Sequence, residues 1–386
     1  MHGKLIDFRR GKMYTLSVGD FISEAAKSVY PYAVKTRRIL HSMPELSDEE
    51  YKTSEFLYGE LTSMGYKPVR IHTGMFVDVK GSEGKKTVAL RCDFDALPVC
   101  EKTGLPFASN NGCMHACGHD AHTAMCLSVA KVLAGSPPKN NVRLIFQFGE
   151  EGAGGAARMI DGGAIDDIDM IFALHLSPDV LKGNFSTCAG AMFAGVIEFD
   201  AEFYGKSSHV AMLDEGSDAL AAAVAFMGDA QSGAAKLGSK VRLHVGKVSA
   251  GSARNIVADY AKLECTLRFH DKKDGIDVLA AAEKALTAAD AKFGTAGKIN
   301  ILTEYPPLIN DAAAVEEFLR HADAAEAKPA FTAEDFAMYL QRTRGCMAWL
   351  GVRDGAHTYP LHSDKFDFDE SAMLSGIDVL LKLVRS

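Results

Sequence analysis

The chain has 386 residues, of which 47% are hydrophobic and 24% are charged, and this predicts a globular protein with a sizeable core and two or three structural units. Its formal net charge of -8 offers no electrostatic basis for binding nucleic acid, and no apolar run approaches the roughly 20 residues that span a membrane. Eight scattered cysteines, several of them within apolar runs, are typical of reduced thiols in a cytoplasmic protein.

The first half of the chain alternates helical and strand-like segments. Residues 1–19 lack the apolar core of a signal peptide, and a helical pattern then covers residues 21–42, where Pro31 should break or kink the helix. A further helix should begin at Ser47, whose side chain can cap it. The next segments are strand 87–91, helix 121–133, strand 142–148, helix 153–161 and strand 170–174. Strands that alternate with helices predict an α/β fold whose sheet contains parallel pairs.

The pattern changes near Phe193. Residues 196–204 alternate apolar and polar side chains, as a half-exposed strand does. Helix 218–230, strands 240–248 and 261–269, helix 275–291 and strand 298–304 follow. This βαββαβ order predicts a small antiparallel sheet with two helices on one face. We therefore expect a domain of residues 192–304 inserted between the two parts of a discontinuous catalytic domain, 1–191 and 305–386.

Residues 114–120 (MHACGHD) contain the first candidate metal ligands. Cys117 and His119 lie two residues apart in a glycine-containing turn just before a helix. Thiolate and imidazole are common zinc ligands. Taken alone, the pair is better explained by a buried thiol and a helix-capping histidine in a tight turn, and only the further matches below favour metal ligands.

Two aspartates end the strand at 87–91. Asp93 and Asp95 lie where the carboxyl ends of parallel strands gather ligands. A carboxylate at this edge can orient a metal-binding imidazole, which we expect of Asp95. The alternative for both is an ordinary turn or helix-capping aspartate.

Glu150 and Glu151 end the next strand. Adjacent side chains there point to opposite sides, so one carboxylate can bind a metal while the other accepts a proton from water. A solvated acidic turn is the alternative. The glycines in residues 152–155 also resemble a dinucleotide-binding turn, but two acids would then lie where pyrophosphate binds and would repel it.

Two further histidines complete a ligand set. His175 ends strand 170–174, and His362 lies in a loop before an acidic helix start. The set is sufficient for two divalent ions that share a water, and it consists of Cys117, His119, Glu151, His175 and His362. A thiol and imidazoles favour zinc, carboxylates also admit manganese, and cobalt or nickel would fit.

The inserted domain supplies candidates for substrate contacts. His209 follows the strand that begins this domain and could stabilise an oxyanion. Asn255 and Arg268 could recognise a substrate carboxylate, because the guanidinium of arginine offers a planar pair of donors. All three are also compatible with ordinary loop or sheet positions.

Several segments together carry a family resemblance, and they cover nearly the whole chain. They are 37–41 (RRILH), 44–46 (PEL), 91–98 (RCDFDALP), 114–120 (MHACGHD), 150–152 (EEG), 173–175 (ALH), 334–336 (EDF) and 361–363 (LHS). The chain resembles the dinuclear-metal aminoacylase and exopeptidase superfamily. Within it, the chain looks like the amidohydrolase branch of hippurate hydrolases, auxin–amino acid conjugate hydrolases and N-acetyldiaminopimelate deacetylases.

The resemblance implies a zinc-exopeptidase-like catalytic domain with a central mixed sheet, and an inserted α+β, ferredoxin-like lid domain that forms a homodimer or higher oligomer. It also implies that the five ligands hold two metals, that Glu150 is the general base and proton shuttle, that Asp95 orients a ligand and that His209 helps to bind substrate. Two departures stand out. Residues 207–213 (SSHVAML) lack the paired glycines and the proline usual in relatives, and Cys92 replaces a more usual alanine.

We therefore expect a metal-dependent hydrolase of N-acyl amino acids. A dipeptidase or carboxypeptidase with the same metals is the alternative enzyme, although no acid is evident to pair with a free α-amino group. A non-catalytic ligand-binding homologue is the alternative from another class, and the complete set of ligands and Glu150 argues against it.

Overall fold

The computed structural model describes residues 4–6, 13–15, 22–152 and 154–385. The chain divides into two compact units. The first unit comprises Met1–Ala189, Asn310–Ala327 and Tyr339–Ser386, and the second comprises Gly190–Ile309 and Lys328–Met338. Lys328–Met338 thus belongs to the second unit, although the segments before and after it in the chain belong to the first unit. Among the described residues, no helix is both long enough and apolar enough to span a membrane.

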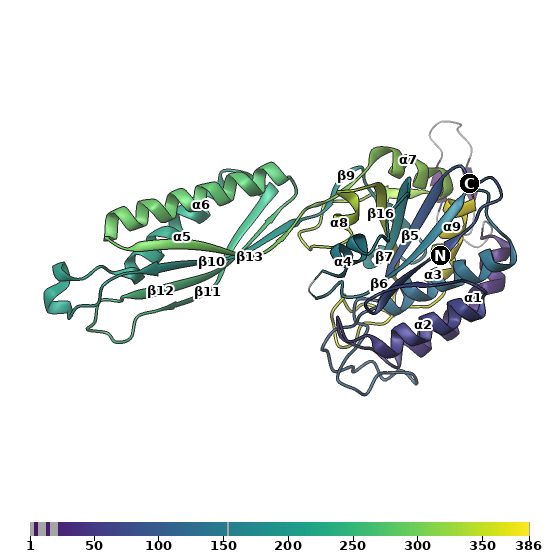
Figure 1. Cartoon of the computed structure of the whole chain (residues 1–386), viewed down its shortest axis with the longest axis horizontal. Helices are drawn as coiled ribbons and strands as arrows, with labels where there is room; N and C mark the ends of the chain where they lie inside the picture. Colours follow the sequence, from purple (N-terminus) through teal and green to yellow (C-terminus); the bar gives the residue numbers. More distant parts are fainter. Residues whose placement is uncertain (1–3, 7–12, 16–21, 153, 386) are drawn as a thin grey trace. The chain divides into compact units, whose positions relative to one another are not determined.

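The first unit is built on one mixed sheet of eight strands (Figure 1). Its order is β15-β8-β16-β7-β5-β6-β4-β3. The strands are β3 Val69–Ile71, β4 Gly74–Val79, β5 Thr87–Asp93, β6 Asn141–Gln147, β7 Met170–Leu181, β8 Phe185–Thr187, β15 Ala324–Glu326 and β16 Arg344–Arg353. Strand β5 runs parallel to β6 and β7, and β7 runs parallel to β16, whereas β4 is antiparallel to β6. The carboxyl ends of β5, β6 and β7 therefore meet at one edge of the sheet.

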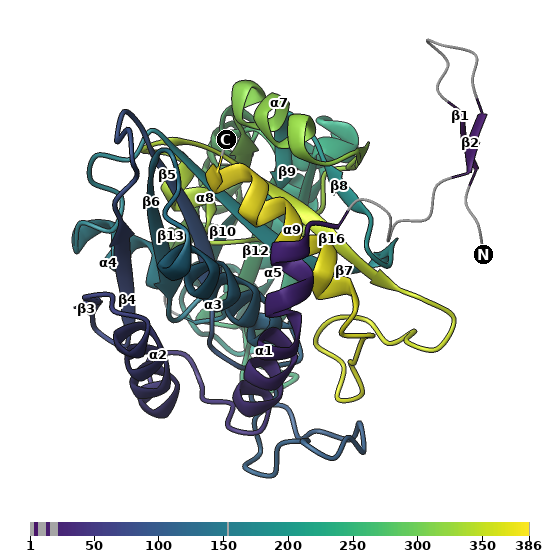
Figure 2. The same cartoon turned by 90° about the vertical axis from the view of Figure 1, so that its right-hand side faces the viewer.

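Helices cover this sheet, and one of them is almost completely enclosed. The helices are α1 Glu24–His41, α2 Tyr51–Ser63, α3 His119–Gly135, α4 Gly155–Asp161, α7 Ala312–His321, α8 Ala337–Leu340 and α9 Ala372–Arg385. Helix α3 contacts α1, α9 and β5 (Figure 2) and is buried from His119 to Ala130. Strands β1 Lys4–Ile6 and β2 Met13–Thr15, at the start of this unit, pair antiparallel with each other.

Two local expectations near the N-terminus differ from the structure. Pro31 does not break the first helix in two: α1 is continuous from Glu24 to His41, because it tolerates the loss of one backbone hydrogen bond while it packs against α3 and α9. Ser47 does not cap helix α2. Its hydroxyl instead donates to the buried carboxylate of Asp95, and Glu45 accepts the N–H group of Thr53 at the start of α2.

The second unit contains a four-stranded antiparallel sheet of order β11-β12-β10-β13. Its elements are β9 Gly190–Phe193, β10 Gly195–Tyr204, the 3-10 helix Val210–Glu215, α5 Ala219–Ala235, the 3-10 helix Gly238–Lys240, β11 Val241–Ala250, β12 Tyr260–Phe269, α6 Lys272–Phe293, β13 Ala296–Tyr305 and β14 Leu308–Asn310. The order β10-α5-β11-β12-α6-β13 matches the predicted βαββαβ pattern.

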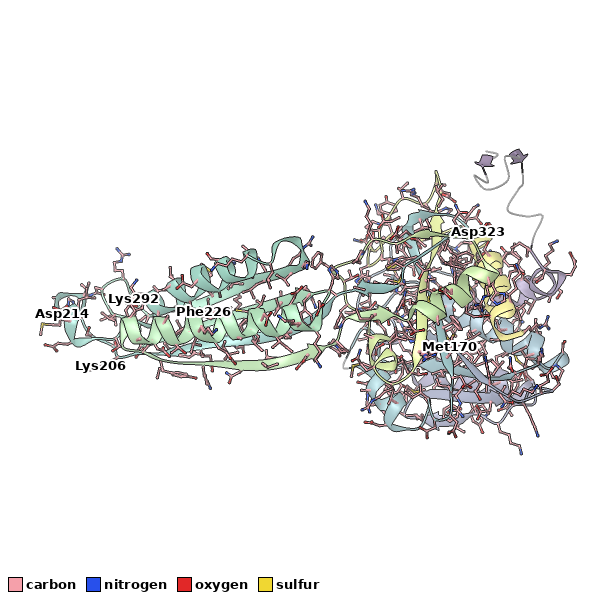
Figure 3. All side chains as sticks on the ribbon, turned by 90° about the horizontal axis from the view of Figure 1, so that it is seen from above. Met170, Lys206, Asp214, Phe226, Lys292 and Asp323 are labelled. Carbon is pink, nitrogen blue, oxygen red and sulfur yellow. The ribbon has the colours of Figure 1, made fainter. Side chains whose placement is uncertain are left out.

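Alternate side chains of β10 form the core of this second unit. Phe199 and Phe203 pack with Phe226 of α5 and with the apolar face of α6. Figure 3 labels Phe226 within this layer, and Lys206 and Asp214 at the end of the unit that carries the 3-10 helix Val210–Glu215. The period-two pattern of residues 196–204 thus reflects one face on the core and one face outside it.

Candidate metal centre

The turn between Cys117 and His119 depends on a glycine. Gly118 has φ of 88°, in the left-handed region, and a Cβ atom there would lie 2.7 Å from Leu176 Cδ1. Glycine therefore fits both the backbone conformation and the close packing. This turn presents the Cys117 thiol and starts helix α3 at His119.

The five predicted ligands come together at the carboxyl edge of the sheet. Cys117 Sγ lies 3.4 Å from His175 Nε2 and 3.3 Å from His362 Nε2. Their ligand atoms form two groups, each within 4.8 Å: Cys117, His119 and His175 in one, and Cys117, Glu151 and His362 in the other. The Cys117 thiol is shared by both groups.

The donor atoms fit divalent metal ions. His119 Nε2 is buried and has no hydrogen-bond partner among the described residues. A buried polar atom of this kind is costly to leave unpaired, and a bound cation would satisfy it. His175 donates its Nδ1–H to the carbonyl oxygen of Leu176 at 2.8 Å, so its Nε2 is left for the ligand group. A thiol, imidazoles and a carboxylate together form a donor set that suits zinc and related ions.

Burial sets the protonation of these ligands when no cation is bound. It raises the pKa of the Cys117 thiol well above its usual range. Burial, reinforced by His122, lowers the pKa of His175 well below its usual range and keeps that imidazole neutral. A neutral imidazole is ready to bind metal, whereas the thiol must lose a proton when a cation binds.

Asp95 links the ligands to the strand ends. Its Oδ1 lies 3.2 Å from His119 Nδ1, and its Oδ2 accepts hydrogen bonds from the Ser47 hydroxyl at 2.6 Å and the Glu151 N–H at 2.8 Å. Burial alone would raise the pKa of Asp95, but these hydrogen bonds outweigh it and lower the pKa. An ionised Asp95 fixes which nitrogen of His119 faces the ligand group.

A second buried network lies behind the ligands, and sequence reasoning missed its central residue. His122 donates its Nδ1–H to Asp93 Oδ1 at 2.7 Å, while its Nε2 accepts the N–H of Leu176 at 3.0 Å. Arg91 contacts the other oxygen of Asp93. His122 follows His119 by three residues on one helix, and this spacing was the available signal that both face the same way.

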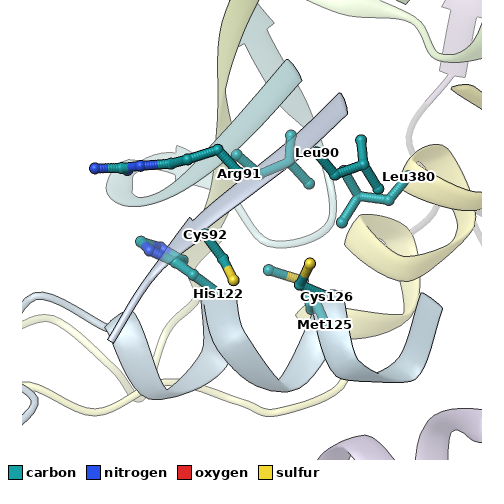
Figure 4. A pocket seen from close by; sticks show the side chains of 8 residues that line it. Leu90, Arg91, Cys92, His122, Met125, Cys126 and Leu380 are labelled. Atoms are coloured by element: carbon teal, nitrogen blue, oxygen red, sulfur yellow. The ribbon is translucent and has the colours of Figure 1, made fainter. Parts of the chain in front are cut away.

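The packing behind His122 is tight. A cavity of about 10 Å³ lies there, room for one water at most. Leu90, Arg91, Cys92, His122, Met125, Cys126, Leu174 and Leu380 line it (Figure 4). No substrate fits in this cavity, so the thiols of Cys92 and Cys126 serve as packing groups behind the ligands.

Helix α1 is tied to the start of helix α3 by buried charges. His41 Nδ1 lies 2.8 Å from Asp120 Oδ2, and His41 Nε2 lies 3.2 Å from Glu101 Oε1. Arg37 contacts the same Asp120 oxygen at 3.1 Å and also Glu370. The segment 37–41 therefore supports the helix that follows the Cys117 turn.

His362 reaches the ligand group from an unusual backbone conformation. Its φ is 66°, rare for a residue with a side chain, and its N–H donates to the Ala116 carbonyl at 2.8 Å. Its side chain is 53% exposed, in contrast to the buried His119 and His175. Backbone strain of this kind gathers at functional sites.

The predicted substrate residues all lie in the second unit. His209 Nε2 is 3.4 Å from Asn255 Nδ2, and its Nδ1 accepts the Ala211 N–H. Arg268 lies near the far end of β12, eight residues beyond Tyr260, which is about 26 Å along a strand. The structure thus brings His209 and Asn255 together and leaves Arg268, which faces Glu198 at 3.9 Å, apart from them.

Comparison with known proteins gives a consistent result. A model of the family described as Peptidase family M20/M25/M40 matches residues 89–386. The chain is 34% identical to the N-acetyldiaminopimelate deacetylase of Oenococcus oeni, over 90% of this chain and 96% of that protein. It is 36% identical to the N-acetyl-L-cysteine deacetylase of Bacillus subtilis, over 88% of this chain and 84% of that protein.

Solved structures with the same fold cover nearly the full length of the chain. A protein from methicillin-resistant Staphylococcus aureus, described as a "putative aminohydrolase", has a TM-score of 0.89 and 27% identity, covering 94% of this chain and 98% of that one. A Bacillus subtilis protein described as a dinuclear metal binding peptidase from the M20 family has a TM-score of 0.80 and 28% identity, covering 93% and 98%.

Proposed function

The chain belongs to peptidase family M20/M25/M40, and we propose that it is a metal-dependent amidohydrolase that cleaves the amide bond of N-acyl amino acids. The observation that carries this proposal is the pair of ligand groups that share the Cys117 thiol, with the Glu150 carboxylate beside them. The deacetylase relatives support N-acetyl amino acids as the first substrates to test.

The ligands divide between two ions. Cys117, His119 and His175 would hold one ion, and Cys117, Glu151 and His362 would hold the other. Zinc or manganese suits this donor set, and cobalt or nickel would also fit. When bound, such ions would supply Lewis acidity that polarises the substrate carbonyl and acidifies water.

Glu150 is the proposed general base. A carboxylate oxygen of Glu150 lies within 4.8 Å of ligand atoms of His119 and Glu151, so it can reach a water held in this group. It accepts the proton of the attacking water and then delivers it to the nitrogen of the leaving amine. The products are a carboxylic acid and a free amino acid.

The second unit supplies the proposed contacts to substrate. His209 would donate a hydrogen bond to the developing oxyanion. Asn255, 3.4 Å from the His209 ring, and Arg268 are the candidates for binding the substrate carboxylate. The βαββαβ order and antiparallel sheet of the second unit support a ferredoxin-like domain. Its role as a lid that forms a homodimer or higher oligomer is proposed from the family resemblance alone. The eight free cysteines support a cytoplasmic location.

The test is a hydrolysis assay on a panel of N-acyl amino acids and dipeptides, with chelated enzyme reloaded with Zn²⁺ or Mn²⁺. We expect metal-restored release of amine from N-acyl amino acids, abolished in Glu150→Gln while bound metal, measured by atomic emission, is unchanged. His209→Ala should lower kcat without loss of metal. Cleavage of dipeptides alone would favour the peptidase alternative, and full turnover by Glu150→Gln would refute the role of the base.

A further inference from the structure

The segment between helices α1 and α2 lies against the ends of two central strands. The carbonyl of Glu45 accepts the N–H of Ala96 at 2.8 Å, just beyond the end of β5. The Ser47 hydroxyl donates to Asp95 at 2.6 Å. This short connection therefore touches the strand end that orients His119, and no role in the chemistry has so far been assigned to it.

Glu50 ends this segment and is fully buried. Its Oε1 accepts the N–H of Gly149 at 2.9 Å, and its Oε2 accepts the hydroxyl of Thr73 at 2.8 Å. Gly149 has φ of 64° and forms the turn that leads from β6 into Glu150. Glu50 thus binds the peptide group between Phe148 and Gly149, and Gly149 is the residue immediately before the proposed base.

The same turn is also held from its other side. The N–H of Glu151 donates to Asp95 Oδ2 at 2.8 Å, and Ser47 donates to the same oxygen. The backbone N–H groups on both sides of Glu150 therefore donate to carboxylates. Glu50 provides one of these carboxylates, and Ser47, from the same connection, hydrogen-bonds to the other, Asp95. Such double anchoring limits the positions that the Glu150 side chain can adopt.

A carboxyl group at position 50 loses its hydration on folding, because the side chain is fully buried. Burial, together with the nearby charge of Asp95, raises the pKa of Glu50 to about 7, although the Thr73 hydroxyl acts in the opposite direction. The other charged groups close by, Asp48 and Arg158, pair with each other. A packed apolar side chain would avoid the cost of desolvation but could not accept the Gly149 N–H.

We infer that Glu50 is a positioning residue that holds the Gly149 peptide and, through it, orients the Glu150 carboxylate toward the attacking water. This inference rests on the proposed function, because it takes Glu150 as the base. A displacement of about 1 Å in a reacting group can cost on the order of 100-fold in rate, so a rigid turn at this point has a direct kinetic consequence.

The experiment compares four variants of the full-length, metal-loaded enzyme. Glu50→Ala removes the acceptor, and Glu50→Gln keeps an oxygen that can accept the Gly149 N–H. Thr73→Val removes only the second partner of Glu50, and Glu49→Gln changes the exposed neighbouring glutamate as a matched control. The measurements are hydrogen exchange of the Gly149 amide, kcat and KM on the substrate that the hydrolysis panel identifies, bound metal and melting temperature.

For Glu50→Ala we expect Gly149 exchange at least 10-fold faster and kcat lower by about 10- to 100-fold, with KM and metal content close to those of the parent. Glu50→Gln should recover most of both losses, and Thr73→Val and Glu49→Gln should change neither by more than about threefold. A folded Glu50→Ala with unchanged Gly149 exchange overturns the inference, and so does one with unchanged kcat. The exchange measurement needs no substrate, so a wrong function and a wrong role for Glu50 are separable.

Discussion

His41 joins helix α1 to the start of helix α3, and we predict that its replacement removes a pH-dependent part of the free energy of unfolding. Burial alone would lower the pKa of His41, but its hydrogen bonds to Asp120 and Glu101 outweigh burial and raise the pKa from 6.5 to about 9. The folded chain then binds this proton more tightly than the unfolded chain does. The stabilisation is complete below pH 6.5 and is lost as pH rises through 9.

The magnitude follows from the size of this shift. Each pH unit between the unfolded and folded pKa contributes about 1.4 kcal/mol, so a rise from 6.5 to about 9 corresponds to about 3 kcal/mol. The His41 side chain is only 1% exposed, and its two acidic partners are also buried, so solvent screens the interaction little. A contribution of this size is a substantial fraction of a typical stability of 5–15 kcal/mol.

The assay is urea unfolding of the parent and of His41→Gln in chelator at pH values from 6 to 9.5. We expect the difference in unfolding free energy between the two proteins to shrink by about 3 kcal/mol across this range. His244→Gln serves as the control, because His244 is exposed and lies in the second unit. Parallel stability curves for parent and His41→Gln would refute the reasoning, as would a His41 imidazole that titrates near 6.5 by NMR.

Three further predictions concern glycine, core packing and metal. Gly155→Ala would place a Cβ atom 1.6 Å from the Phe148 carbonyl oxygen, so we expect the free energy of unfolding to fall by more than about 3 kcal/mol. Gly59→Ala, at an exposed helical position with open space around it, should raise the free energy of unfolding by up to about 1 kcal/mol. Thermal melts of both variants check this. Phe226→Ala should cost about 3–5 kcal/mol and speed amide exchange in the second unit, and unchanged exchange there would count against the described core. Burial raises the pKa of the Cys117 thiol. Burial alone would lower the pKa of His119, but the charge of Asp93 acts against burial and the pKa is raised, so both groups must lose a proton when Zn²⁺ binds. The apparent Kd for Zn²⁺ should therefore fall about 10- to 100-fold for each pH unit from 6 to 8, and calorimetry showing a pH-independent Kd would contradict this.

The elements nearest the ligands were predictable because their signals are local. Strand β5 is an apolar run that ends at Asp93, and the apolar run of β6 leads into Glu150 and Glu151. His175 was expected to end its strand, but it lies within β7, which continues to Leu181. The glycine turn before α3 marks the start of that helix, and the parallel pairs of the α/β sheet followed from the alternation of strands and helices. The position of β16 between β7 and β8 did not, because strand order depends on contacts between distant residues that leave no mark on either segment.

The residues that support the site were harder to find for the same reason. His122 contacts Asp93 across 29 positions, and Glu50 contacts Gly149 across 99 positions. A single histidine within a helix, or a single glutamate just before a helix, has no sequence feature that marks it as a supporting residue. The Ser47 prediction was wrong because a nearby buried carboxylate competes for the hydroxyl that a helix cap would use.

The central place of β16 in the sheet has a consequence for how the protein is made. A ribosome produces β7 and β8 long before Arg344, the first residue of the strand that lies between them. Until then β7 has an open edge that can pair with other chains, so the nascent protein should depend on chaperones or on fast synthesis of its remainder. His362 lies nine residues after the end of β16, so a product terminated before β16 would lack both the closing strand and one proposed metal ligand. Only a product that extends past His362 would carry all five proposed ligands.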